Sequence, residues 1–264
     1  MPPAAFALAP PLTAMLDHVF LLPAWAQLLV CAAYGLVMFA ASAGVLQLLH
    51  RRHLQNARLL PVGPAFQIVT VLFALLLGFL AADLWAQQRQ AVDAAFKEAL
   101  AFNRLAVLAE SAAPQQPAAA TLLQDYRAAV ADAEWGRDAN QVADPRATAA
   151  LKAMRVMGVA DGAMRPALAA EWMRATGELQ EARDRRLLIG TDTTDNSQWT
   201  LVLMLAFFAA VALAVCHMDR PPAGRLILAV FALALTLVFW QLARHTNPYA
   251  GGDLRIPVPL ALKS

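Results

Sequence analysis

The chain has 264 residues, a formal net charge of +2 and only 15% charged residues. Its mean hydropathy of +0.50 is too high for an ordinary water-soluble protein, so membrane-spanning segments are expected. The one long polar stretch, residues 87–198, contains 13 Lys and Arg against 15 Asp and Glu. Because nucleic-acid binding needs a clustered basic face, this near-neutral stretch argues against a nucleic-acid partner.

Four apolar blocks of 17 to 26 residues carry no Asp, Glu, Lys or Arg. They are Ala24–Leu49, Phe66–Ala82, Trp199–Val215 and Leu226–Ala243. A helix needs about 20 residues to cross the hydrocarbon layer of a bilayer, so four transmembrane helices are predicted. The first 23 residues contain no Lys or Arg, which is atypical of a cleavable signal peptide.

The blocks divide the chain into two membrane hairpins with a polar insert between them. The predicted parts are an N-terminal segment (1–23), a first hairpin (24–86), the insert (87–198), a second hairpin (199–245) and a C-terminal tail (246–264). Residues 50–64 and 217–225, each with two prolines and a glycine, are expected to be the hairpin loops. An even number of spans places both termini and the insert on the same side of the membrane.

Basic residues near the spans indicate on which side of the membrane the insert and the termini lie. Three arginines follow the first span, namely Arg51, Arg52 and Arg58. They favour a cytoplasmic short loop and therefore an extracytoplasmic insert and termini. Arginines before the third span and after the fourth favour the opposite orientation.

The insert has the composition of helices, being rich in Ala, Leu, Glu, Gln and Arg with no strand-like alternation. The second transmembrane helix is expected to run on into it without a break, because no proline occurs between Pro64 and Pro114. The predicted helices cover residues 66–112, about 118–138, from Pro145 onward and from Pro166 to about Gly190. A polar loop, residues 191–198, follows them. The predicted fold is therefore an all-α membrane protein with a helical-bundle insert.

One stripe of the long second helix changes from apolar to polar as the helix leaves the bilayer. Helical spacing predicts that Leu72, Leu76, Leu80, Asp83 and Gln87 share this face. One interpretation is an aqueous path with an apolar constriction at Leu76 and Leu80 and a polar mouth beyond. The alternative is an interfacial Asp83 that pairs with a basic residue or faces headgroup water.

A short basic run before the third span contains Arg183, Arg185 and Arg186. These side chains are candidates for charges that concentrate anions at a pore mouth. The alternatives are pairing with acidic residues on neighbouring helices and a solvated, ion-paired helix face, which is the commoner arrangement.

No catalytic motif occurs, so the protein is not expected to be an enzyme, and no cofactor is expected. His50, His53 and His217 were considered as metal ligands, but histidine also suits the headgroup interface, and no metal site is predicted. Cys31 and Cys216 lie in or at the end of predicted spans and are expected to pack as small apolar residues.

Three segments carry a family resemblance. The segment "FALLLGFLAADLWAQQRQAVDAAFKEALAFNRLAVLAESAAP" resembles the second-helix region of the bestrophin-like domain family of bacterial membrane proteins. "LQEARDRRLLIG" before the third span and "NPYAGGDLRIPVPL" after the fourth also match that family. The matching positions are Trp85, Glu98, Leu105, Pro114, Pro248, Tyr249, Gly251 and Pro257.

The resemblance implies the arrangement of two spans, helical insert and two spans. It also implies a distant relationship to the bestrophins, which are homopentameric anion channels whose second helices line the pore. The expected protein is therefore a homo-oligomeric ion channel of the bacterial inner membrane, for anions more than cations. Its expected partners are further copies of itself, favoured as a pentamer, the lipid bilayer and small inorganic ions. A ring of Asp83 side chains would oppose anion passage.

A second hypothesis comes from a different functional class. The long uninterrupted helix and the mixed-charge insert would also suit a non-conducting membrane scaffold or an envelope-stress sensor. Such a protein would act through its helical insert.

Overall fold

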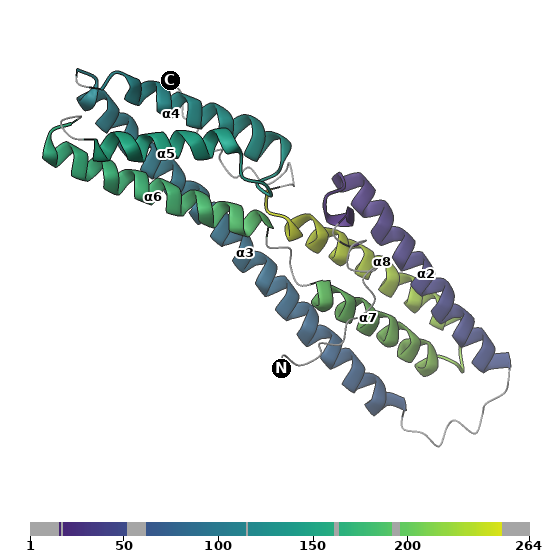
Figure 1. Ribbon diagram of the computed structural model, residues 1–264. Coiled ribbons are helices and arrows are strands. Elements are labelled where there is room, and N and C mark those ends of the chain that lie inside the picture. The colour runs from purple at the N-terminus through teal and green to yellow at the C-terminus, as the bar shows by residue number, and fades with distance from the viewer. Residues whose placement is uncertain are drawn as a thin grey trace, which may run out of the picture. The chain divides into compact units, whose positions relative to one another are not determined.

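The computed structural model describes residues 16, 18–51, 62–114, 116–160, 164–191 and 196–249, and these contain helices and no strands. The all-α fold class is confirmed. In chain order the helices are α2 (Ala24–Arg51), α3 (Val62–Ala112), α4 (Ala118–Ala129), the π-helix η2 (Val130–Arg137), α5 (Pro145–Val159), α6 (Pro166–Thr191), α7 (Asn196–Cys216) and α8 (Pro221–Thr246), as Figure 1 shows. Most of the predicted N-terminal segment, and the tail beyond Tyr249, lie outside the described residues.

The chain divides into two compact units. The membrane unit comprises residues 1–85 and 193–247, and the insert bundle comprises residues 86–192 and 248–264. Helix α3 contributes to both, since its residues up to Trp85 belong to the membrane unit and those from Ala86 belong to the insert bundle.

Four helices among the described residues are long and apolar enough to cross a membrane. They are Ala24–Arg51, Phe66–Ala112, Ser197–Cys216 and Pro221–Thr246, with mean hydropathies of 2.1 to 2.5 in their most apolar windows. The four predicted spans are confirmed. The fourth helix begins earlier than expected, because Pro221 and Pro222 occupy its first turn. Proline is tolerated there because the first-turn N–H groups have no partner within the helix.

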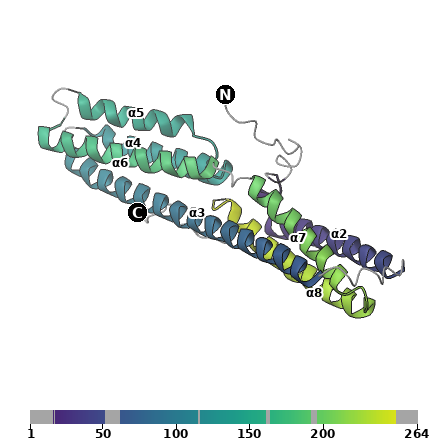
Figure 2. The same cartoon turned by 90° about the horizontal axis from the view of Figure 1, so that it is seen from below.

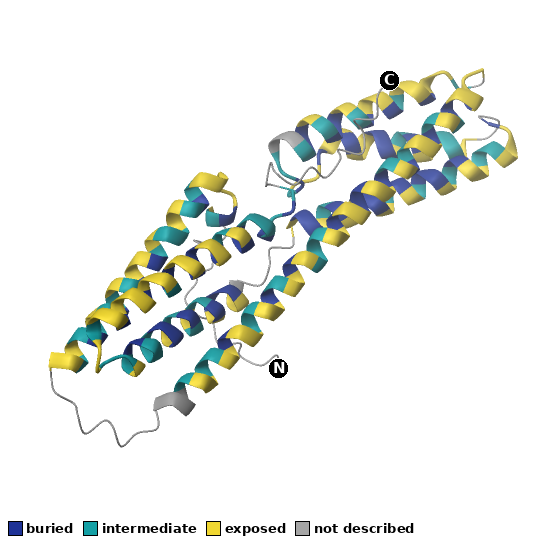
Figure 3. Cartoon of the chain, turned by 180° about the vertical axis from the view of Figure 1, so that it is seen from behind, coloured by how far each residue is buried: buried dark blue, intermediate teal, exposed yellow. Residues whose placement is uncertain are grey.

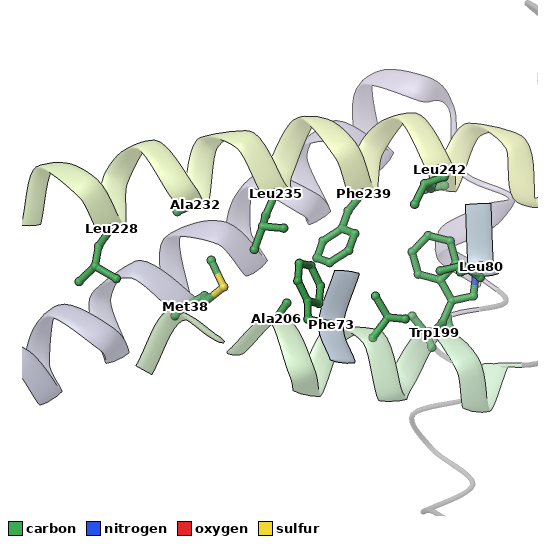
Figure 4. Packing of buried hydrophobic residues seen from close by; sticks show 14 of the residues in the cluster. Met38, Phe73, Leu80, Trp199, Ala206, Leu228, Ala232, Leu235, Phe239 and Leu242 are labelled. Carbon is green, nitrogen blue, oxygen red and sulfur yellow. The ribbon is translucent and has the colours of Figure 1, made fainter. Parts of the chain in front are cut away.

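In the membrane unit, α2 approaches α8 closely at Gly35. A Cβ atom at this position would collide with the Thr236 hydroxyl and lie 3.4 Å from the carbonyl oxygen of Ala232. Small residues permit such close backbone approach, which replaces the hydrophobic effect as a source of helix association in lipid. Buried side chains of all four helices fill the remaining space, including Phe239, Trp199 and Leu80 (Figure 4).

In the insert bundle, α4, α5 and α6 lie side by side (Figures 1 and 2). Their core includes Tyr126, Met154 and Trp172, and the Trp172 indole donates a hydrogen bond of 2.8 Å to the Met154 carbonyl. Helix α5 begins at Pro145 as expected, with the Asp144 carboxylate accepting a 2.7 Å bond from the Arg146 amide. The helix expected to cover residues 118–138 differs, because its last two turns are the π-helix η2.

Candidate functional site

One face of α3 packs into the core of the membrane unit. Phe73, Leu80 and Leu84 are buried there, and Leu76 is partly buried against the same cluster. Their spacing of three or four residues marks a single helical face. Figure 4 shows Leu80 directed into this cluster, where its side chain is only 1% exposed.

The opposite face of α3 is open along the span. Ile68, Leu72, Leu75 and Phe79 are exposed large apolar residues, and Phe79 is 62% exposed. Exposed positions recur along α3 in Figure 3. This face is available to lipid or to another copy of the chain.

The residues of the predicted stripe divide between the two faces. Leu80 lies in the chain's own core and Leu76 packs against it, so neither belongs to the open face of α3 in the single chain. Leu72 and Asp83 are exposed as expected. Asp83 is three residues from buried Leu80, so it lies at the border of the open face. Gln87 is partly buried and has an interaction partner.

The part of α3 in the insert bundle also carries exposed apolar side chains. Val92, Phe96, Leu100 and Val107 are all exposed, and Phe96 is 64% exposed. Their spacing of four, four and seven residues places them on one helical face. A water-exposed helix rarely presents so many large apolar residues in one stripe unless the stripe contacts another protein.

The insert bundle contains a buried charge cluster centred on Arg186. This guanidinium contacts the Glu98 carboxylate through Nε at 2.5 Å and through Nη2 at 3.0 Å, and Nη2 also contacts Glu134 at 2.7 Å. Arg186, Glu98 and Glu134 are fully buried. Arg186 also donates a hydrogen bond to the Asn140 side chain and lies over the Trp135 ring, 5.4 Å from its centroid.

Arg183 completes the cluster from the preceding turn of α6. Its Nη2 lies 2.5 Å from the Glu134 carboxylate and 3.1 Å from the Thr148 hydroxyl. The Tyr126 hydroxyl donates a 2.7 Å hydrogen bond to Glu98. Two arginines therefore balance two glutamates inside the bundle, and helices α3, η2 and α6 are joined through them.

The cluster changes the titration of its members. Burial alone would lower the pKa of Arg186, but the Glu98 carboxylate and its hydrogen bond outweigh burial and raise that pKa. Burial, followed by the adjacent Glu98 charge, raises the pKa of Tyr126 well above its ordinary value. Arg186 is therefore charged and Tyr126 neutral at any physiological pH.

The predicted basic run divides between two environments. Arg183 and Arg186 are paired with Glu134 and Glu98 and buried in the insert bundle, so each guanidinium is neutralised and enclosed there. Arg185 is exposed.

Sequence reasoning missed Glu134 and did not assign Glu98 a role. The available clue was the spacing of Arg183 and Arg186, which places two arginines on one face of α6 and requires buried acids opposite that face. Which acids these are depends on tertiary packing, because the insert has many Asp and Glu residues.

The described residues contain no group of three or more His, Cys, Asp or Glu placed to hold a metal ion. His50 Nδ1 lies 3.1 Å from the Met218 carbonyl oxygen, and His217 Nδ1 lies 2.9 Å from that of Leu213. His53 is outside the described residues. Cys31 and Cys216 are free thiols.

The four apolar helices define a multi-pass, all-helical membrane protein. The bestrophin-like domain family matches residues 31–254, which is most of the chain. The protein belongs to this bestrophin-like family, which relates it to the bestrophin channels. No curated protein and no solved structure matches it.

Proposed function

We propose that the protein is a homo-oligomeric ion channel in which α3 lines the pore with its open face. The observation that carries the proposal is the exposed apolar surface of α3, within the span and beyond it. Inside the span this surface includes Leu72, Leu75 and Phe79. Membership of the bestrophin-like family supports a channel role.

An oligomer is required because four helices from one chain rarely enclose an aqueous pore, and the open face of α3 is not covered within the single chain. In a closed ring, each copy presents the same surface to its neighbours and to the symmetry axis. The stripe of Val92, Phe96, Leu100 and Val107 supports this assembly, since a second α3 would cover it. We take a pentamer as the expected ring, on the relationship to bestrophins.

The pore constriction in this proposal consists of Leu72, Leu75 and Phe79. Rings of such side chains can close a pore to ions by excluding water. Leu76 and Leu80, which the sequence suggested as the constriction, instead pack against the core of the membrane unit.

Two features bear on the choice of ion. Anions are the expected permeant species because of the family relationship, and the protein is expected to act without enzymatic chemistry. Asp83 is exposed and lies eleven residues, or about three helical turns, after Leu72, so both share one side of α3 and a ring of Asp83 carboxylates at the pore mouth would oppose anions. Arg183 and Arg186 supply no free positive charge, because glutamates neutralise them.

The proposed location is a bacterial inner membrane with the insert on the extracytoplasmic side. The exposed Arg51 at the end of α2 supports a cytoplasmic short loop. Arg52 and Arg58, the other two arginines behind this orientation, lie outside the described residues. Protease protection in sealed, inside-out vesicles should leave the insert uncut, and cleavage there would reverse the orientation.

The function is tested by recording currents from the purified full-length protein in planar bilayers. Conductance is expected, together with a larger conductance for Phe79→Ala because the constriction widens. Reversal potentials in a KCl gradient give the ion preference, which Asp83→Asn should shift further toward anions. A well-assembled oligomer that carries no current would overturn the proposal in favour of a scaffold or sensor.

A further inference from the structure

The insert bundle has an open groove between α4 and α5 with a volume of about 500 Å³. Most of its lining is aliphatic or small, and Lys152 supplies the one charged group of the lining. The lining includes Leu122 of α4 and Ala149, Lys152, Ala153, Val156 and Met157 of α5. Val156 remains 62% exposed although its side chain is apolar.

The lining of the groove extends from Ala149 on α5 to Ala160, just past the end of that helix, a length of about 16 Å. A single alkyl chain can lie along this length, and the small Ala149 and Ala153 side chains leave space for it.

The charged side chains at and beside the groove are positive. Lys152 is exposed and forms no ion pair among the described residues. No acidic residue lines the groove, and Arg155 on the following turn of α5 is a second exposed cation. An anionic group at the end of an apolar chain would therefore meet complementary charge together with an apolar surface.

We propose that this groove binds a fatty acid, with the alkyl chain along Leu122, Ala153 and Met157 and the carboxylate paired with Lys152. The site is independent of the proposed pore. It would give the insert a lipid-sensing surface outside the membrane spans.

The test uses the full-length protein in phosphatidylcholine nanodiscs and a palmitate analogue carrying a diazirine near the end of its chain. After illumination, mass spectrometry should locate the label within residues 149–160 and near Leu122, and unlabelled palmitate should displace it. Labelling confined to the four spans would overturn the proposal, because it reports only partition into the bilayer.

Two variants distinguish the contribution of the alkyl chain to binding from that of the carboxylate. Ala153→Trp fills the groove and should lower labelling there more than tenfold, with unchanged thermal unfolding as the folding control. Lys152→Glu should lower it about fivefold, in line with an exposed ion pair. The matched control Lys97→Glu removes an exposed insert lysine outside the groove and should have no effect.

Competitors identify the headgroup. A diazirine analogue with an alcohol in place of the carboxylate should label wild type and Lys152→Glu equally. Displacement of the palmitate probe by lysophosphatidylcholine as readily as by palmitate would overturn the carboxylate pairing. Unchanged labelling in Ala153→Trp, or a cross-link from the groove to a second copy, would overturn the assignment of the groove to a fatty acid.

Discussion

Buried polar groups have different partners in the membrane unit and in the insert bundle. In the membrane unit, the Tyr34 hydroxyl donates a hydrogen bond to the Leu203 carbonyl at 2.6 Å and the Thr236 hydroxyl donates one to the Ala232 carbonyl at 2.9 Å. In the insert bundle, two arginines and two glutamates are buried together. The first unit is held by close helix packing, and the second is held by packing plus a charge cluster.

The difference follows from the solvent around each unit. Lipid gives no hydrophobic driving force between helices, so close approach at small residues such as Gly35 stabilises the membrane unit. Water drives the apolar core of the insert together, but it does not select one register among similar alanine-rich helices. We infer that the cluster around Arg186 selects that register, because its partners must meet at one depth.

The largest expected effect is loss of the charge cluster. Arg186→Met should destabilise the insert bundle by about 3–5 kcal/mol, because Glu98 and Glu134 are left buried without their partner. Thermal unfolding followed by far-UV circular dichroism measures the change. Arg185→Met, one residue away and exposed, should change stability by less than about 0.5 kcal/mol. Equal effects of the two variants would show that the cluster does not hold the bundle.

A smaller effect is expected at the contact between α2 and α8. Gly35→Ala should cost about 1–3 kcal/mol, since the added methyl group collides with the Thr236 hydroxyl. Gly44→Ala on the same helix is the matched control, because nothing lies within 4 Å of its Cβ position. Unfolding in SDS titrations compares them. Similar midpoints would contradict the close-packing account of the membrane unit.

The smallest effect concerns the start of α5. Asp144→Ala should cost about 0.5–2 kcal/mol through loss of the helix cap. The hydrogen bond from Arg146 lowers the pKa of Asp144, so this stabilisation is present above the ordinary Asp value of 3.8 and is lost as pH falls through the lowered pKa.

Asp144→Asn tests the charge separately from the cap. This variant should retain most of the cap at neutral pH and lack the acid-dependent part. Thermal unfolding at pH 7 and pH 3 measures both contributions. A wild-type pH dependence that matches the Asn variant would refute the assignment.

Much of the fold could be predicted because its determinants are local. Spans follow from apolar length, and the starts of α4, α5 and α6 follow from Pro117, Pro145 and Pro166. The π-helix η2 has no such local signal, and its Glu134 pairs with two arginines on another helix that are distant in the sequence. The sequence also does not determine which face of a helix is buried.

The open face of α3 illustrates this limit most clearly. Its span is apolar on all sides, so hydrophobic periodicity does not distinguish the core face from the exposed face. The sequence placed Leu72 and Leu80 on one stripe, whereas packing against the other helices buries Leu80 and leaves Leu72 exposed. The basic run was ambiguous for a similar reason, since its partners lie far away in the sequence.

Thiol accessibility under current recording tests the central claim most directly. Leu75→Cys and Leu80→Cys would be compared in a background with Cys31 and Cys216 replaced by alanine. A charged, water-soluble methanethiosulfonate reagent should alter the current of Leu75→Cys, whose side chain lines the pore, and leave that of Leu80→Cys unchanged. Modification of the current through Leu80→Cys but not Leu75→Cys would contradict the account, and so would the absence of current from the assembled protein.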